Sequence, residues 1–321
     1  MKTWPKRLLV TATVSLLAGG LLTGFGVVSG AQKEFNRLST PHQQDLVTQS
    51  QEFTELKGFE LSSSHRNLFI KESKDTNFHL TYQIDKKNHQ PNVTTNGQFL
   101  SFQDPDFLNS ENSENIVTTP FSAMLGYARD SHPLDVTLEV PKGKSLEQLD
   151  ALITHGDIRL ENLTASVQEL HTSYGQIQIS HSHISSIDQD PTDDSFYGYM
   201  TALSDIILNH SSFNYLTLIS FKENIQGTNN SFSGESRINA EKDINLSLRK
   251  DNLQELNLDL YYSSSHVQLP NHQTLKEGKL PQVKKGKYYQ NHYPGTSHYQ
   301  APHPKGTLTL EGGEIHLSEM P

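Results

Sequence analysis

The sequence predicts an all-β protein, built as a parallel β-solenoid (β-helix-like, with single-stranded repeats) behind one N-terminal transmembrane helix. Two observations predict this fold class. Apolar and polar residues alternate in short segments, as in strands with one buried face, and a strand-like motif recurs along the second half of the chain. The composition agrees, because only 19% of the 321 residues are charged and 34% are hydrophobic. An antiparallel β-sandwich with polar edges is the alternative interpretation.

The N-terminal end is typical of a membrane anchor. Residues 8–28 carry no charge, and as a helix they would span about 31 Å, which matches one hydrocarbon core. Residues 1–7 contain basic residues and no acid (Lys2, Lys6 and Arg7), so the positive-inside rule places them in the cytoplasm and the rest of the chain outside. We therefore expect a single-pass protein of the cell membrane with an extracellular C-terminal domain. A cleaved signal peptide, with Ser29-Gly30-Ala31 as the cleavage site, is the alternative.

The exported part divides into a short polar segment and a long region of strands. Residues 29–58 are polar with scattered apolar positions, and we expect a juxtamembrane stalk there. Period-2 alternation starts near Phe59, so residues 59–318 are expected to form the solenoid. The early strands are expected at residues 68–70, 78–82, 99–102 and 134–140.

The repeat is clearest around two glycines. His155-Gly156-Asp157-Ile158 returns nineteen residues later as Tyr174-Gly175-Gln176-Ile177, a degenerate copy follows at Gly198, and a last copy contains Gly313-Glu314-Ile315. A glycine before each strand allows a tight corner where a Cβ atom would clash. Stacked strands can then line up their aliphatic side chains into a shared core. The side chains expected to point inward and stack are those of Ile158, Ile177, Ile244, Leu258 and Ile315.

Several segments, taken in order, resemble a known bacterial family. They are residues 68–72 running on to 78–82, then 96–102, 138–143, 155–163 and 313–317. Together they are similar to a cell-envelope family of unknown function described as "putative adhesin", over residues 55–318. The resemblance implies a β-solenoid at the cell surface without established enzyme activity, and some members are tied to envelope stress in Gram-positive bacteria. It brings no site residues, and the chain departs from the pattern at residues 188–195 and around Gly198.

The composition and motifs also exclude several kinds of function. The chain has no cysteine, which excludes a disulfide framework, a Cys-ligated zinc site, a thiol nucleophile and a lipid-modified cysteine. The formal net charge of −10 argues against a nucleic-acid partner. There is no Gly-x-Ser-x-Gly motif, and no acid lies in an apolar segment that would raise its pKa. We therefore expect neither enzyme activity nor a cofactor.

The most unusual stretch covers residues 276–305, which contain six lysines and one acid, interleaved with tyrosine, histidine and proline. Cationic groups beside aromatic faces suit an anionic polymer, a lipid headgroup or a sugar. Cell-wall polymer, anionic lipid or an envelope protein are therefore the expected partners. The candidate ligand-binding residues are Lys284, Lys285, Lys287, Tyr288, Tyr289, His292, Tyr293 and His298. A solvated insertion without a ligand is the alternative.

Two short clusters are candidates for a metal site. His181 and His183 would share one face of a strand about 7 Å apart, a spacing that can hold a transition metal with a third ligand. Asp188 and Asp190 begin an acidic loop whose oxygens suit calcium, but the loop lacks the EF-hand pattern. Solvent-facing strand positions and a solvated acidic loop are the alternatives.

These observations together predict a non-enzymatic, membrane-anchored protein of the bacterial cell envelope. It would bind an envelope component or a partner protein, and a role in the envelope-stress response is the finer expectation. An adhesin that binds a host or neighbouring-cell ligand through the basic stretch is the alternative.

Overall fold

The computed structural model describes residues 46–85, 90–104, 133–187, 198–267, 276–277 and 295–320. These residues form 21 strands and one short helix, α5 (Lys250–Gln254). The strands are β1 (Leu46–Phe53), β2 (Gly58–Glu72), β3 (Phe78–Asp85), β4 (Asn92–Asn96), β5 (Phe99–Gln103), β6 (Leu134–Val140), β7 (Ser145–His155), β8 (Ile158–Glu161), β9 (Thr164–Tyr174), β10 (Ile177–Ser180), β11 (His183–Ser186), β12 (Gly198–Ala202), β13 (Ile206–Asn209), β14 (Ser212–Asn214), β15 (Leu216–Ser220), β16 (Ile225–Ala240), β17 (Ile244–Leu248), β18 (Leu256–Val267), β19 (Lys276–Glu277), β20 (Gly295–Tyr299) and β21 (Gly306–Glu319). Within these ranges no helix is long and apolar enough to cross a membrane, and the expected span over residues 8–28 lies outside them.

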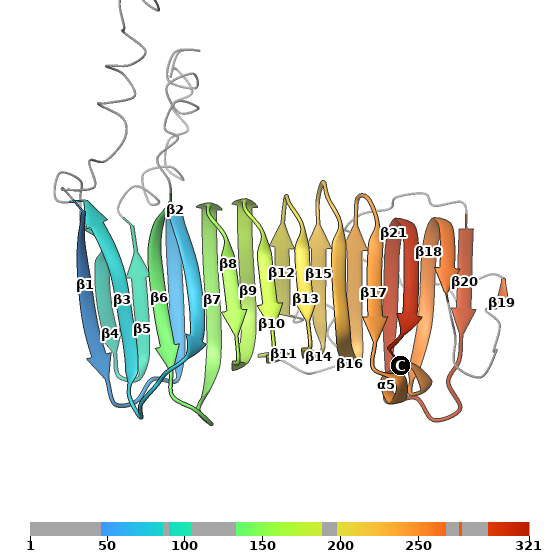
Figure 1. Ribbon diagram of the computed structural model, residues 1–321, viewed down its shortest axis with the longest axis horizontal. Coiled ribbons are helices and arrows are strands. Elements are labelled where there is room, and N and C mark those ends of the chain that lie inside the picture. Colours follow the sequence, from blue (N-terminus) through green and yellow to red (C-terminus); the bar gives the residue numbers. More distant parts are fainter. Residues whose placement is uncertain are drawn as a thin grey trace, which may run out of the picture. The chain divides into compact units, whose positions relative to one another are not determined.

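The chain winds in coils, and successive coils place their strands side by side (Figure 1). The strand pairs define three faces. Face A contains β1, β3, β6, the second part of β2, β8, β10, β13, the start of β16, β17, and the ends of β21 and β18. Face B contains the starts of β7 and β9, then β11, β14 and the middle of β16. Face C contains β4, β5, the first part of β2, the ends of β7 and β9, β12, β15, the end of β16, the starts of β21 and β18, β20 and β19.

Pairing between successive coils is parallel, from β2 and β8 on face A to β18 and β21 at the far end. Antiparallel pairs occur towards the two ends of the sheet, for example β4 with β5 and β18 with β20. The predicted parallel solenoid is therefore confirmed, and the β-sandwich alternative is wrong.

The core consists of inward side chains stacked in rows across the coils. On face A the row of successive register partners is Leu68, Ile158, Ile177, Ile206, Ile225, Ile244 and Ile315, all with 0% exposure. On face C the corresponding row is Leu61, Ala151, Leu170, Met200, Leu218, Ile238, Leu310 and Leu260, also with 0% exposure. The predicted inward residues are all buried, although Leu258 stacks on Leu308 of face C and not in the isoleucine row.

Two of the corner glycines are required by close packing between coils. Gly156 has φ +144°, and a Cβ atom there would lie 1.9 Å from the carbonyl oxygen of Arg66. A Cβ atom on Gly175 would lie 1.9 Å from the carbonyl oxygen of Gly156. The next two coils have Ser204 and Glu223 at this position, so the tight approach is confined to the first coils.

Polar side chains at the corner between faces C and A link one coil to the next. Asp157 Oδ1 accepts a hydrogen bond from the backbone N–H of Gln176 at 3.1 Å. Asp205 Oδ1 accepts one from the N–H of Asn224 at 3.1 Å, and Asn224 Oδ1 accepts one from the N–H of Asp243 at 3.2 Å. These bonds satisfy backbone donors that have left the sheet at the turn, and they fix the distance between coils.

The structure corrects the assignment of one repeat. Gly198 does not start a copy of the Gly-Asp-Ile motif, because β12 pairs with β9 and β15 on face C. The third copy is instead Asp205-Ile206, whose strand β13 pairs with β10 in register. The feature that the copies share is the polar side chain before the isoleucine, whereas glycine is required only at Gly156 and Gly175 in the first coils.

The sheet begins earlier than expected. β1 starts at Leu46 and pairs with β3, so this part of the 29–58 segment, where a stalk was expected, belongs to the sheet. Its apolar residues Val47 and Phe53 pack against the edge of the core. Burial of these two side chains accounts for the extra strand.

Candidate binding face

Three carboxylates lie in register on the outward side of face C. Glu60 of β2 is the register partner of Asp150 of β7, and Asp150 is the partner of Glu169 of β9. Neighbouring strands are about 4.8 Å apart, and the inward rows on both sides hold them there. Like charges directly opposite each other destabilise a sheet. We call these three residues the carboxylate row.

Asp150, in the middle of the row, is the most perturbed of the three acids. Its Oδ1 atom is buried and has no hydrogen-bond partner among the described residues. Burial, and to a lesser degree the charges of Glu169 and Glu60, raise the pKa of Asp150 to about 6. The expectation that no acid has an apolar setting that raises its pKa is therefore wrong. The local sequence Leu149-Asp150-Ala151 does not indicate this pKa shift, because the burial comes from the neighbouring coils.

A histidine lies beside the carboxylate row on the same face. His171 Nδ1 forms a hydrogen bond of 2.7 Å with the Thr201 hydroxyl, and its Nε2 forms one of 2.9 Å with the Ser173 hydroxyl. Burial lowers the pKa of His171, and the charge of Glu169 opposes this effect. The ring is therefore held neutral at neutral pH and does not supply a positive charge to the acids beside it.

Aromatic rings stack at the corner next to this face. The His65 and His155 rings are 4.5 Å apart and nearly parallel, and the His155 and Tyr174 rings are 4.7 Å apart. Tyr174 is 59% exposed, while His155 Nδ1 is buried and has no hydrogen-bond partner among the described residues. This stack of three rings ends in the exposed ring of Tyr174, whose size suits contact with a flat apolar or sugar surface.

Two of the four predicted metal ligands, His181 and His183, lie among the described residues, and these two do not share a strand face. His181 occupies a corner with φ 50°, and its ring stacks on that of His210 at 5.0 Å. His183 starts β11, and its Nδ1 forms a hydrogen bond with the Ser212 hydroxyl. The corner between the two histidines breaks the alternation on which the prediction rested. Across the described ranges, no group of three or more His, Asp or Glu residues is placed to hold a metal ion. Asp188 and Asp190 lie outside those ranges.

Most of the predicted basic site also lies outside the described residues, namely Lys284, Lys285, Lys287, Tyr288, Tyr289, His292 and Tyr293. His298 is the exception. It lies on β20, and its Nδ1 contacts Asp259 Oδ1 on β18 at 2.6 Å. Strand pairing aligns these two residues, so His298 belongs to the sheet and helps hold β20 against β18.

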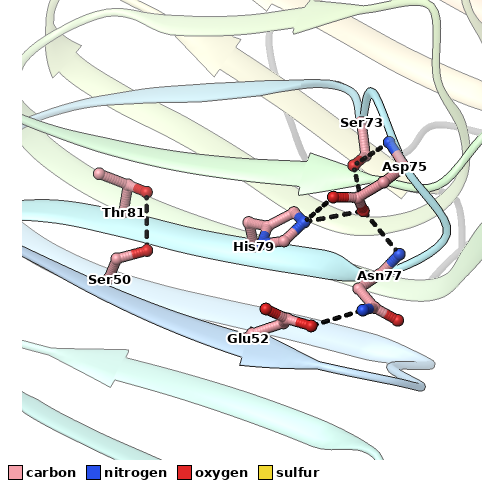
Figure 2. A network of polar contacts seen from close by, with 7 residues as sticks. All are labelled: Ser50, Glu52, Ser73, Asp75, Asn77, His79 and Thr81. Carbon is pink, nitrogen blue, oxygen red and sulfur yellow. Dashed lines mark hydrogen bonds and ion pairs between the residues drawn. The ribbon is translucent and has the colours of Figure 1, made fainter.

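Another cluster contains serine, histidine and aspartate but lacks the arrangement of a nucleophilic site (Figure 2). His79 Nε2 contacts Asp75 Oδ1 and Oδ2 at 2.8 and 3.0 Å. The Ser73 hydroxyl donates to Asp75 Oδ1 at 3.3 Å, so it contacts the acid and not the imidazole. Asn77 donates its backbone N–H to Asp75 and its side-chain amide to Glu52 of β1. These contacts fix the turn between β2 and β3 and link it to β1.

The carboxylate row was missed at the sequence level, although part of its signal was present. Asp150 and Glu169 are nineteen residues apart, which is the spacing of the repeat. That spacing could have placed them on adjacent strands. Glu60 could not have been added, because the intervening strands leave its register undetermined.

Comparison with known proteins gives one extensive family match. The family model described as Toastrack DUF4097 matches residues 56–311, which is most of the chain and nearly the whole solenoid. No curated protein matches the sequence.

Solved structures of low similarity were also found. A putative adhesin from Bacteroides fragilis is 13% identical, with a TM-score of 0.31, over 88% of this chain and 99% of that one. A putative cell adhesion protein from Clostridium sporogenes is 10% identical, with a TM-score of 0.31, over 85% and 100%. A putative lipid binding protein from Parabacteroides distasonis is 10% identical, with a TM-score of 0.29, over 87% and 98%.

Proposed function

We propose that this chain, which belongs to the Toastrack DUF4097 family, is a non-enzymatic binding protein of the bacterial cell envelope. It would be anchored by its N-terminal segment and would bind an envelope component outside the membrane. Cell-wall polymer is the first candidate ligand. A part in the envelope-stress response is a finer proposal, which rests on the resemblance of the sequence to the bacterial cell-envelope family.

The anchor is supported by the sequence. The uncharged run over residues 8–28 has the length of one hydrocarbon core. The basic residues before it favour a cytoplasmic N-terminus. With this orientation, the solenoid would lie on the outer side of the membrane, where wall polymers are found.

The structural observation that carries the binding role is the regularity of the outward faces. Outward positions recur from coil to coil in fixed register, for example those of Arg159, Gln178 and Ile207 on face A, although the side chains differ. The spacing between coils is about 4.8 Å, and the buried rows beneath keep it constant. A rigid, periodic surface suits a polymer with repeating groups, because little conformational entropy is lost by the protein on binding.

The basic stretch over residues 276–305 is the proposed contact with an anionic polymer. Its two described strands, β19 and β20, pair with each other, and β20 pairs with β18 on face C. Six lysines and one acid in this stretch give an attraction that salt would screen beyond about 8–10 Å at physiological ionic strength.

The test is co-sedimentation of the full-length protein, in proteoliposomes of neutral lipid, with insoluble cell walls that carry teichoic acid. The variant replaces Lys284, Lys285 and Lys287 with Gln. The matched control replaces Lys142, Lys144 and Lys222, which removes the same charge from the solenoid surface. We expect binding to fall steeply with salt and to be lost in the first variant only. Equal binding by both variants, or binding that does not respond to salt, would contradict the proposed contact, and no binding by the unmodified protein would contradict cell-wall polymer as the ligand.

A further inference from the structure

Buried neighbours restrict how far the acids of the carboxylate row can move apart. Phe59 and Leu61 flank Glu60 on β2, and Leu149 and Ala151 flank Asp150 on β7, with exposures of 0–1%. These residues anchor the backbone on both sides of Glu60 and Asp150 in the buried rows, and buried Leu170 anchors the backbone after Glu169. The repulsion between the carboxylates is therefore built into the fold.

No described cation lies close enough to neutralise the row. The elements packed against β7 are β2 and β9, which place Glu60, Glu169 and the neutral His171 on this side. Along the row beyond Glu169 come Tyr199, Thr217 and then Arg237. Arg237 is three strands from Glu169, or about 14 Å, which exceeds the screening length at physiological ionic strength. Lys57, near the start of β2, is held by Glu147 at 3.1 Å.

We propose that the carboxylate row is a proton-binding element, in which Asp150 takes up one proton from solvent as the pH falls from neutral to mildly acidic. This uptake stabilises the first coils of the solenoid. The proton removes the central charge, so each remaining carboxylate loses its nearest like-charged neighbour. It also gives the half-buried carboxyl group, whose Oδ1 atom has no hydrogen-bond partner among the described residues, a neutral form.

The direction of the effect follows from linkage. The pKa of Asp150 is raised from 3.8 to about 6 in the folded protein. The folded state therefore binds this proton more readily than the unfolded state, and the row destabilises the fold increasingly as the pH rises from about 4 through about 6. This inference does not depend on the proposed binding function. It would make the first coils respond to acidification of the medium.

The test compares the thermal midpoints of the full-length protein and its variants at about pH 5.5 and about pH 7.5. Asp150→Asn keeps the shape and removes the charge. We expect it to raise the midpoint at the higher pH and to reduce the gain that the unmodified protein shows on acidification. The control Glu161→Gln removes an exposed charge of face A, where the register partner is Ser180, and should leave the gain unchanged.

A second variant keeps the test informative if Asp150→Asn fails to fold. Glu169→Gln removes one neighbouring charge, so the row should bind its proton at a lower pH, and the infrared signal of the protonated carboxyl group should appear at correspondingly greater acidity. The proposal is wrong if Asp150→Asn lowers the midpoint at the higher pH. It is also wrong if the acid-induced gain is the same in both proteins, or if Glu169→Gln leaves the carboxyl titration where it was.

Discussion

Ile177 lies directly beside Ile158 on the next coil, in register on adjacent parallel strands, and both side chains have 0% exposure. The two residues are nineteen positions apart in the sequence, so one coil of the solenoid equals one period of the repeat here. The contact is continued on both sides by Leu68 and Ile206. The isoleucine row thus forms a continuous part of the core through the middle coils.

Replacing Ile177 with Ala should therefore be costly. The change leaves a cavity between two coils, and we expect a loss of about 2–5 kcal/mol in the free energy of unfolding. The neighbouring Gln178 points outward, and Gln178→Ala should change stability by less than about 0.5 kcal/mol. Urea unfolding of the two variants checks this. Similar losses for both would mean that the inward and outward positions are assigned wrongly.

Replacing Gly175 with Ala should destabilise the corner. The new Cβ atom would lie 1.9 Å from the carbonyl oxygen of Gly156, and backbone cannot yield as a side chain can. We expect a cost of at least about 1–3 kcal/mol. At Gly312 the nearest atom is Cγ1 of Ile244 at 3.0 Å, a much longer approach than the one at Gly175, so Gly312→Ala should cost less. The thermal midpoints of the two variants test this order, and the reverse order would contradict the packing at the corner.

The polar corner can be tested at Asp205. Its Oδ1 accepts hydrogen bonds from the N–H and the side-chain amide of Asn224 at 3.1 and 3.3 Å. Asp205→Ala leaves the backbone donor without its partner, and we expect a loss of about 1–3 kcal/mol. Asp205→Asn retains an acceptor oxygen and should recover most of that loss. Chemical denaturation would refute the coil-to-coil role of this side chain if the Asn variant were as unstable as the Ala variant.

The turn in Figure 2 should give stability a dependence on pH. The hydrogen bond to Asp75 raises the pKa of His79 above 6.5. The stabilisation from this pair is thus fully present below about pH 6.5 and is lost as the pH rises through the higher folded value. His79→Gln should remove that part of the slope, whereas the exposed His303→Gln should not. A thermal midpoint series across this range checks it, and an unchanged slope in the His79 variant would show that the pair contributes nothing.

The sequence was sufficient to predict the solenoid because its alternation and its repeat report the same physical constraint. Ile158, Ile177, Ile244 and Ile315 were recognised as inward residues, and the structure places all four in one row. The missed copy at Asp205-Ile206 shows the weakness of matching by glycine, since Ser204 fills the corner there. A search based on a polar residue followed by isoleucine would have found it.

The candidate site was less accessible to sequence reasoning, because it depends on contacts between distant coils. Asp150 looks like any solvent-facing strand residue until Glu60 and Glu169 are placed on either side of it. The expected histidine pair failed for a similar reason, since a corner at His181 interrupts the alternation. Such corners and long-range registers are set by the stacking of coils, which local patterns do not report.

The central claim is that the solenoid is held outside the membrane by a retained N-terminal anchor. It is tested most directly by carbonate washing of membranes that contain the full-length protein, combined with protease treatment of intact cells. We predict that the full-length chain stays in the washed membrane pellet and that external protease removes its C-terminal domain. A mature protein that begins at Gln32 and is found in the medium would contradict the anchor, and a C-terminal domain protected in intact cells but cleaved after lysis would contradict the orientation.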